Sequence, residues 1–215
     1  MSGQTMTGRP MPRAALVAGA AGPIGFVLVT FVLAALRDDV IDRQGWVSWP
    51  SSMALGGVSG VPMIATFLWL SACYLVFSLG ALRPAAISGV AVAGYLVTAS
   101  GDLLLAFPTD ALGRPTSWHG TLHIVGVAVA TAGTMIVCAS LLAATGGRGA
   151  WRALRPAAAV LVAATVVGIA GGFDEAWAKV VYVVGITLPA AVVPWCLRRA
   201  HTDRRAADIE AEALT

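Results

Sequence analysis

The chain has 215 residues, of which 58% are hydrophobic and 12% are charged, and its mean hydropathy is +0.80. Soluble domains carry about 25% charged residues, so this composition excludes an ordinary soluble protein and indicates an integral membrane protein whose main partner is the lipid bilayer. The net charge of +3 does not indicate a nucleic-acid partner, because the basic residues are spread over separate segments as membrane topology requires.

Long apolar segments recur along the chain. A helix that crosses the hydrocarbon core needs about 20 mostly apolar residues. Six segments qualify, at 14–36, 61–82, 86–107, 120–144, 156–172 and 178–197. We therefore predict an all-α fold, an integral membrane bundle of six transmembrane helices over residues 14–197, with tails at 1–13 and 198–215. Short connections between the last five segments predict antiparallel neighbours in one domain.

The basic residues predict the orientation of this bundle, because Lys and Arg accumulate on the cytoplasmic side. If the N-terminus is inside, only four of the 14 basic residues face outward, namely Arg37, Arg43, Arg114 and Lys179. We therefore expect both termini to be cytoplasmic and the protein to lie in the cell membrane. One lysine against thirteen arginines, together with the many Ala, Gly and Val residues, indicates a GC-rich bacterial genome.

Two of the predicted outer segments carry charged side chains. Residues 37–60 form a connection that is long for a helical bundle, and we expect it to fold over the bundle as a cap. Near the start of the last helix, Glu175 and Lys179 are four residues apart, which predicts a solvated pair on one helix face.

The third and fourth segments place an acid and two imidazoles near the outer side. Pro108 should end the third helix near Phe107, five residues after Asp102, and His123 lies five residues after a predicted helix start at Trp118. Both side chains then lie about 8 Å below the helix ends. Thr116 or Ser117 is the expected N-cap, and His119 lies one turn above His123. These positions predict an outward-facing polar pocket formed by Asp102, Asp110, His119, His123, Ser52 and Ser100.

Three interpretations of this pocket remain open. Asp102 could accept a hydrogen bond from His123 and act as a structural tether between two helices. Histidines at i and i+4 could instead share a divalent metal such as zinc, with Asp102 or Asp110 as third ligand, although "HGTLH" lacks the glutamate base of HExxH enzymes. Proton handling by Asp102 and His123 is a third interpretation, but no matching acid or histidine lies in the inner half of any predicted helix.

Two functions therefore follow from the residues. The first is a non-enzymatic membrane protein whose pocket binds a small-molecule, lipid or ion ligand, or has only a structural role. The alternative is a metal-dependent intramembrane hydrolase that acts on a lipid-like substrate. Faces of small residues on the helices also permit a homo-oligomer.

Short motifs resemble those of a known family. Ser52 with Leu55 and Gly56, then "FPTD" at 107–110 and "HGTLH" at 119–123, are similar to the bacterial and archaeal membrane proteins of domain-of-unknown-function family 998, over about residues 14–197. This resemblance implies about six helices and no known activity.

A fainter resemblance leads to membrane hydrolases of the alkaline ceramidase and adiponectin-receptor type, which hold zinc with an Asp and three His beside a Ser. Asp102, His119 and His123 could correspond to their ligands, and Ser52 or Ser100 to the serine. The third intramembrane histidine is missing and those proteins have seven helices, so both differences argue against a hydrolase.

Overall fold

The computed structural model describes residues 12–55, 60–83, 89–144, 154–170 and 176–213, and this structure is 88% helical with no β-strand among these residues. The elements in chain order are α1 (Arg13–Leu36), α2 (Asp38–Gln44), η1 (Trp46–Ser48), η2 (Ser51–Ala54), α3 (Val61–Phe77), the π-helical turn η4 (Ser78–Leu82), α4 (Gly89–Leu105), α5 (Trp118–Ala144), α6 (Leu154–Ala170) and α7 (Ala176–Ala213). The expected all-α fold is confirmed for this part of the chain.

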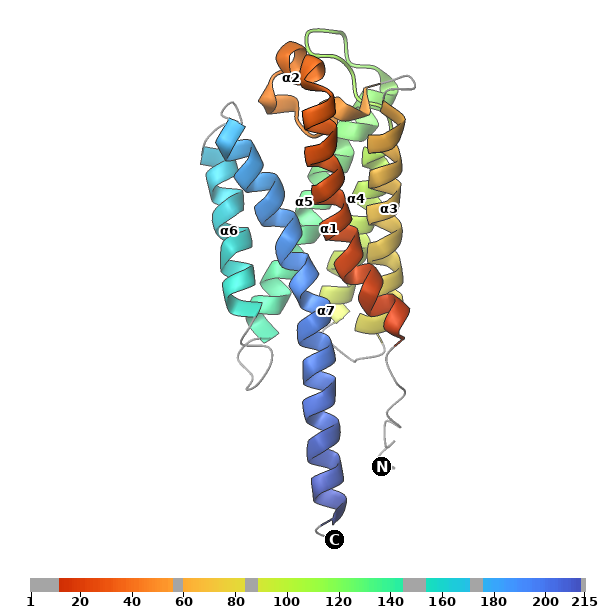
Figure 1. Cartoon of the computed structure of the whole chain (residues 1–215), viewed down its shortest axis with the longest axis vertical. Coiled ribbons are helices and arrows are strands. Elements are labelled where there is room, and N and C mark those ends of the chain that lie inside the picture. The colour runs from red at the N-terminus through yellow and green to blue at the C-terminus, as the bar shows by residue number, and fades with distance from the viewer. Residues whose placement is uncertain (1–11, 56–59, 84–88, 145–153, 171–175, 214–215) are drawn as a thin grey trace.

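The long helices pass up and down beside one another. Helix α1 packs against α3 and α7, α3 packs against α4, α4 lies closest to α5, and α6 packs mainly on α7. Figure 1 shows that α1 begins and α7 ends at one end of this bundle, while α2 covers the opposite end. We call these the terminal end and the cap end.

Among the described residues, four helices are long and apolar enough to cross a membrane. They are Arg13–Leu36, Val61–Leu82, Trp118–Ser140 and Ala176–Arg199. The sequence predicted six spans, but α4 is a shorter apolar helix and α4 and α6 each have 17 residues. Parts of their predicted lengths, 86–88 and 171–172, lie outside the described residues, as does most of the predicted tail at 1–13.

The end of α4 explains part of this difference. Its regular turns stop at Leu105, two residues before the predicted end, and the chain then tightens into bonds from the Ala106 N–H to Leu103 O (3.3 Å) and from the Phe107 N–H to Leu104 O (3.1 Å). Such shorter-range bonds are common at helix ends. Pro108 follows, and the restriction it places on the preceding residue accounts for the stop.

Helix α7 continues far beyond its predicted end at residue 197. It has 38 residues and reaches Ala213, so the segment predicted as a tail is helical as far as that residue. The sequence after Pro194 contains neither Gly nor Pro and is rich in Ala, Arg and Glu, which favour helix. Nothing in its composition therefore ends the helix where the apolar stretch ends.

Small residues allow the backbones of α4 and α5 to touch. A Cβ added at Gly101 would meet the backbone nitrogen of Ala130, and one added at Gly126 would lie 2.7 Å from the nitrogen of Leu105. Gly133 has the same relation to the backbone of Thr98. These contacts hold α4 against α5 along most of its length, which fixes the residues that α4 carries relative to α5.

The expected cap is present at the cap end of the bundle, and we use this name for residues 37–55 together with residues 106–117. The Thr109 N–H donates to Ala54 O (3.1 Å) and the Leu112 N–H donates to Gln44 Oε1 (2.6 Å), so the two segments are joined. Trp49 is fully buried against the ring of Phe31. The cap therefore packs on the bundle through an aromatic anchor.

Candidate functional site

The two histidines of "HGTLH" both contact the end of α4. His119 Nδ1 lies 2.9 Å from Pro108 O, and His123 Nδ1 lies 2.8 Å from Phe107 O. A carbonyl oxygen only accepts, so both imidazoles donate from Nδ1–H. The carbonyl groups that follow the last regular turn of a helix have no hydrogen-bond partner within that helix. The oxygens of Phe107 and Pro108 instead accept hydrogen bonds from the two histidines of α5.

His123 is enclosed more completely than His119. It is 1% exposed, and its ring meets Phe67 edge to face at 5.8 Å between centroids. Its Nε2 has no hydrogen-bond partner among the described residues. The imidazole therefore joins α5, the end of α4 and α3.

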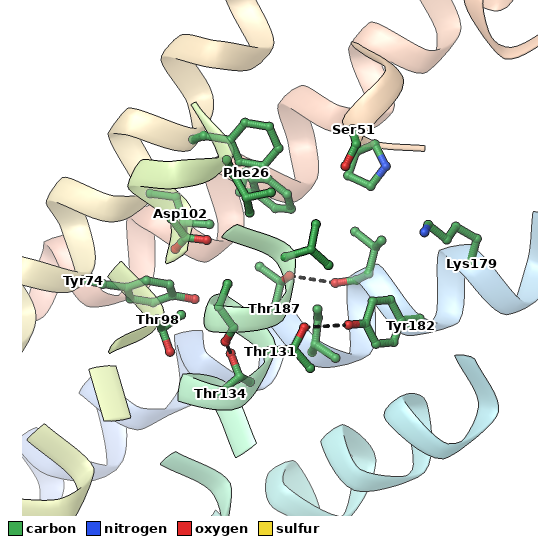
Figure 2. A pocket seen from close by; sticks show the side chains of 18 residues that line it. Phe26, Ser51, Tyr74, Thr98, Asp102, Thr131, Thr134, Lys179, Tyr182 and Thr187 are labelled. Atoms are coloured by element: carbon green, nitrogen blue, oxygen red, sulfur yellow. Dashed lines mark hydrogen bonds between the residues drawn. The ribbon is translucent and has the colours of Figure 1, made fainter. Parts of the chain in front are cut away.

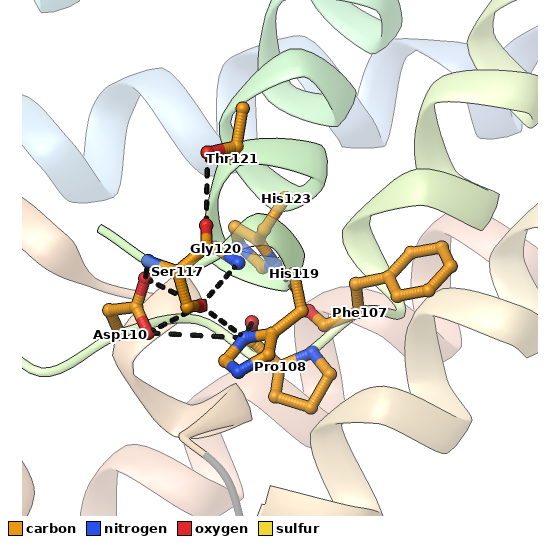
Figure 3. Close-up of polar contacts among 8 residues, drawn as sticks. All are labelled: Phe107, Pro108, Asp110, Ser117, His119, Gly120, Thr121 and His123. Carbon is orange, nitrogen blue, oxygen red and sulfur yellow. Dashed lines mark hydrogen bonds and ion pairs between the residues drawn. The ribbon is translucent and has the colours of Figure 1, made fainter.

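Asp110 and Ser117 form a second group of contacts (Figure 3). The Ser117 hydroxyl is 2.8 Å from Asp110 Oδ1 and 2.8 Å from His119 Nδ1, while the Ser117 N–H donates to Asp110 Oδ2 at 2.7 Å. The Gly120 N–H donates to Ser117 Oγ at 3.1 Å, so Ser117 is confirmed as the N-cap of α5.

Gly120 lies directly beneath this carboxylate. A Cβ at position 120 would collide with Asp110 Oδ2, so the glycine of "HGTLH" makes room for the acid. Hydrogen bonds from the Ser117 N–H and hydroxyl lower the pKa of Asp110 below its ordinary value of 3.8. A negative charge in front of the first turn of α5 also interacts favourably with the helix dipole.

The remaining predicted pocket residues lie in different surroundings. Ser100 is exposed and its hydroxyl donates to Leu96 O in its own helix (2.9 Å). Ser52 is 2% exposed within the cap, with no partner for its hydroxyl among the described residues. Asp102 is 4% exposed, and its Oδ2 likewise has no partner in that part of the chain. The structure records no hydrogen bond between this carboxylate and either histidine of the described helix α5.

No three His, Cys, Asp or Glu side chains come together as a metal-binding group within the described ranges. Each histidine uses Nδ1 for a carbonyl of the neighbouring segment. The geometry of "HGTLH" thus matches a packing contact between helices.

A cavity of about 120 Å³ lies between α1, α3, α4, α5 and α7, below the cap. Of the six residues of the predicted pocket, only Asp102 lines it. The other polar lining residues are Ser51, Tyr74, Thr98, Thr131, Thr134, Lys179, Tyr182 and Thr187. In Figure 2 the carboxylate of Asp102 and the amino group of Lys179 point into the cavity from opposite sides.

Most of the polar residues that line this cavity were not predicted from the sequence. The expected partner of Lys179, Glu175, lies outside the described residues, whereas Lys179 itself is half-buried in the cavity wall. Tyr182 follows three residues later on the same helix and is 3.1 Å from the Thr131 hydroxyl. The one available signal was that the only lysine of the chain lies in the first turn of an apolar helix.

Comparisons with known proteins add no relative. No protein-family model matches the chain, and no curated protein and no solved structure is similar to it.

Proposed function

We propose that this chain is a multi-pass membrane protein that binds a small polar ligand in the cavity beside Asp102. The observation that carries this proposal is a carboxylate oxygen, buried in the bundle and without a protein partner among the described residues, in the wall of a cavity. Acidic side chains inside membrane bundles are costly, about 2.5–3.5 kcal/mol at a helix centre, and usually mark ligand or ion sites.

The size and surroundings of the cavity support a ligand of a few heavy atoms. A dry, apolar protein cavity of about 150 Å³ accommodates benzene, and the volume here is about 120 Å³. Ligand sites generally combine apolar walls with a few converging polar groups. Here Phe26, Phe67 and Leu70 supply apolar wall and Asp102 supplies the strongest acceptor.

We extend the four candidate spans to six, with α4 and α6 as the other two. Seventeen residues of helix measure about 26 Å, close to the thickness of a thin hydrocarbon core. Both helices run beside helices that are long enough to span, namely α5 and α7. Six passes also agree with α1 beginning and α7 ending at one end of the bundle.

The basic residues support a cell-membrane location with the terminal end inside. At that end of the candidate spans Arg13–Leu36, Val61–Leu82 and Ala176–Arg199 lie Arg13, Arg83 and Arg198, and cytoplasmic segments are enriched in such residues. The cap and the cavity below it would then face outward. Membership of domain-of-unknown-function family 998, which has no known activity, is compatible with this arrangement and is part of the proposal.

No observation favours the metal-dependent hydrolase. Its chemistry would need a metal group and an activated nucleophile, and among the described side chains the candidate ligands Asp102, His119 and His123 do not converge. The Ser117 hydroxyl lies beside Asp110 and His119, but it caps α5 and donates to a carboxylate.

A binding screen tests the proposed ligand site. Full-length protein in lipid nanodiscs would be exposed to alkali cations, alkylamines, alcohols, carboxylates and amino acids, and its melting temperature followed by tryptophan fluorescence. A ligand that binds only the folded state raises this temperature. We expect at least one class to stabilise the native protein by several degrees and to lose its effect in Asp102→Asn.

Asp39→Asn is the matched control, because Asp39 is exposed in the cap and is bonded to Arg37 and Arg43. It should respond to ligand as the native protein does. A panel without any effect, or an equal effect in Asp102→Asn, would contradict the proposal.

A further inference from the structure

The two charged groups of the cavity define a ligand class, an inference that rests on the function proposed above. We infer that the ligand is a small aminocarboxylate zwitterion, bound with its ammonium group at Asp102 and its carboxylate at Lys179. These two side chains approach the cavity from opposite sides, Asp102 from α4 and Lys179 from the first turn of α7.

Three threonines of the cavity wall offer hydrogen-bond acceptors. The hydroxyl of Thr98 donates to Gly94 O (3.0 Å), that of Thr134 to Ala130 O (2.9 Å) and that of Thr187 to Val183 O (2.7 Å). A hydroxyl has one hydrogen, so each of these threonines can offer only lone pairs to a ligand. Together with the carboxylate they suit an ammonium group, which has three N–H donors and no acceptor.

Lys179 has the opposite character. Its ammonium group brings positive charge and N–H donors to the cap side of the cavity, where Pro50 and Ser51 of the cap also line the wall. Three N–H donors let one ammonium serve several acceptors at once. The ammonium group of Lys179 can therefore donate to a ligand carboxylate in addition to the contacts that it makes with the protein.

Charge balance distinguishes a zwitterion from a simple amine or a simple acid. An amine would add a positive charge to a cavity that already holds Lys179, and an acid would add a negative charge beside Asp102. Groups of like charge in a poorly hydrated site repel each other and reduce affinity. A zwitterion brings an opposite charge close to each of these two side chains and leaves the net charge of the cavity unchanged.

Apolar side chains separate the two charged groups. Phe26, Phe67 and Val183 line the cavity together with Ile186, and their surfaces fit a short hydrocarbon chain. The distance between the charges on a bound ligand is then set by its number of methylene groups. Aminocarboxylates of increasing length should therefore differ in affinity.

The test compares matched probes on full-length protein in nanodiscs. Glycine, 3-aminopropanoate, 4-aminobutanoate and 5-aminopentanoate vary the length, while n-butylamine and butanoate each carry one of the two charges. Dissociation constants come from melting-temperature shifts at constant ionic strength. We expect one aminocarboxylate to bind at least tenfold more tightly than either half-probe.

Variants assign each charge to its partner. In Lys179→Met the advantage of the aminocarboxylate over n-butylamine should disappear, and in Lys179→Arg it should persist in part. Asp102→Asn should lose both the aminocarboxylate and the amine, and Asp39→Asn should lose neither.

Two other outcomes of these measurements would contradict different parts of the proposal. If n-butylamine or an alkali cation binds as tightly as every aminocarboxylate and depends on Asp102, the zwitterion inference is wrong and the ligand site remains. If none of these probes nor any compound of the wider screen shifts the melting temperature, the ligand site itself is wrong.

Discussion

His123 places its imidazole against the backbone of another helix, and its contacts there are those of a structural residue. Its Nδ1–H satisfies Phe107 O, and its ring packs on Phe67. His119 does the same for Pro108 O closer to the surface. A pair of histidines at i and i+4 thus joins the first turns of α5 to the segment that follows α4.

Replacing His123 by Ala tests this role. The variant leaves a space and removes the partner of the partly buried Phe107 carbonyl, and we expect the free energy of unfolding to fall by about 2–4 kcal/mol. Unfolding in mixed micelles, followed by tryptophan fluorescence, measures this change. Thr121→Ala, at an exposed position of α5, should stay within about 0.5 kcal/mol of the native value; an equal loss in both variants would argue against a specific contact.

Asp110 predicts a dependence of stability on acid pH. Its pKa is lower in the folded protein because the Ser117 N–H and hydroxyl bind the ionised carboxylate. The folded state therefore binds this proton more weakly than the unfolded state. The contribution is complete above the ordinary pKa of 3.8 and is lost as the pH falls through the lower folded value.

The measurement is a series of melting temperatures from neutral pH to about pH 3. Asp110→Asn should be less stable than the native protein at neutral pH and should converge with it in acid. Curves that stay parallel over the whole range would show that the charge of Asp110 contributes nothing.

The stability of an Asp102→Asn variant distinguishes a ligand site from a structural tether between helices. Because its Oδ2 has no partner among the described residues, Asp102→Asn removes a buried acid without breaking a hydrogen bond of that oxygen. We expect the ligand-free variant to be as stable as the native protein or more stable, as is common where function keeps a costly group. A clear fall in melting temperature without ligand would instead favour the tether between helices.

At the scale of elements, the contact between α4 and α5 depends on positions without side chains. Gly101→Leu would push a side chain into the backbone at Ala130, and Gly126→Leu would do so at Leu105. Overpacking of this kind typically costs about 1–3 kcal/mol, and more where the backbone cannot move. Both variants should melt earlier and lose the sharp peak of the native protein in size-exclusion chromatography.

Gly89 supplies the matched control for this prediction. It belongs to the same helix, but a Cβ there meets nothing within 4 Å. Gly89→Ala should therefore leave the melting temperature unchanged or slightly higher, because alanine favours helix more than glycine. If Gly101→Leu behaved in the same way, close approach of the backbones would not be required.

The helices were predictable where composition alone determines them. Apolar stretches of about 20 residues located the cores of α1, α3, α4, α5, α6 and α7, although α4 and α6 are shorter than predicted, and Pro108 indicated where α4 stops. The end of α7 was not predictable from hydropathy, because a helix can continue in polar sequence with favourable propensity. The cavity was missed for a different reason, since it depends on how five helices meet.

Some features of the candidate site were also predictable from the sequence, and others were not. A local pattern predicted Thr116 or Ser117 as the N-cap of α5, of which the structure shows Ser117, and it predicted Asp102 as a buried acid. The predicted hydrogen bond between Asp102 and His123 is absent from the described structure. Such a bond depends on the rotation of α4 against α5, which the close contacts at Gly101 and Gly126 determine. Lys179 reaches the cavity through the packing of α7, which sequence spacing does not reveal.

For the molecule as a whole, the six passes that we propose predict on which side of the membrane each end lies. Alkaline phosphatase is active only outside the cytoplasm, so in a bacterial host a fusion after Leu112 in the cap should be active and one after Ala213 inactive. A green fluorescent protein fusion should give the opposite pattern. Activity at both sites, or at neither, would contradict an even number of spans with the cap outside.

The length of α7 has a practical consequence. Its candidate span ends at Arg199 and its helix at Ala213, so 14 residues of continuous helix extend about 21 Å beyond this span. A helical protein fused in register to this segment would be carried rigidly outside the detergent belt. Such a fusion would give a 21.9 kDa protein the extra mass and visible orientation that particle alignment in electron cryo-microscopy requires.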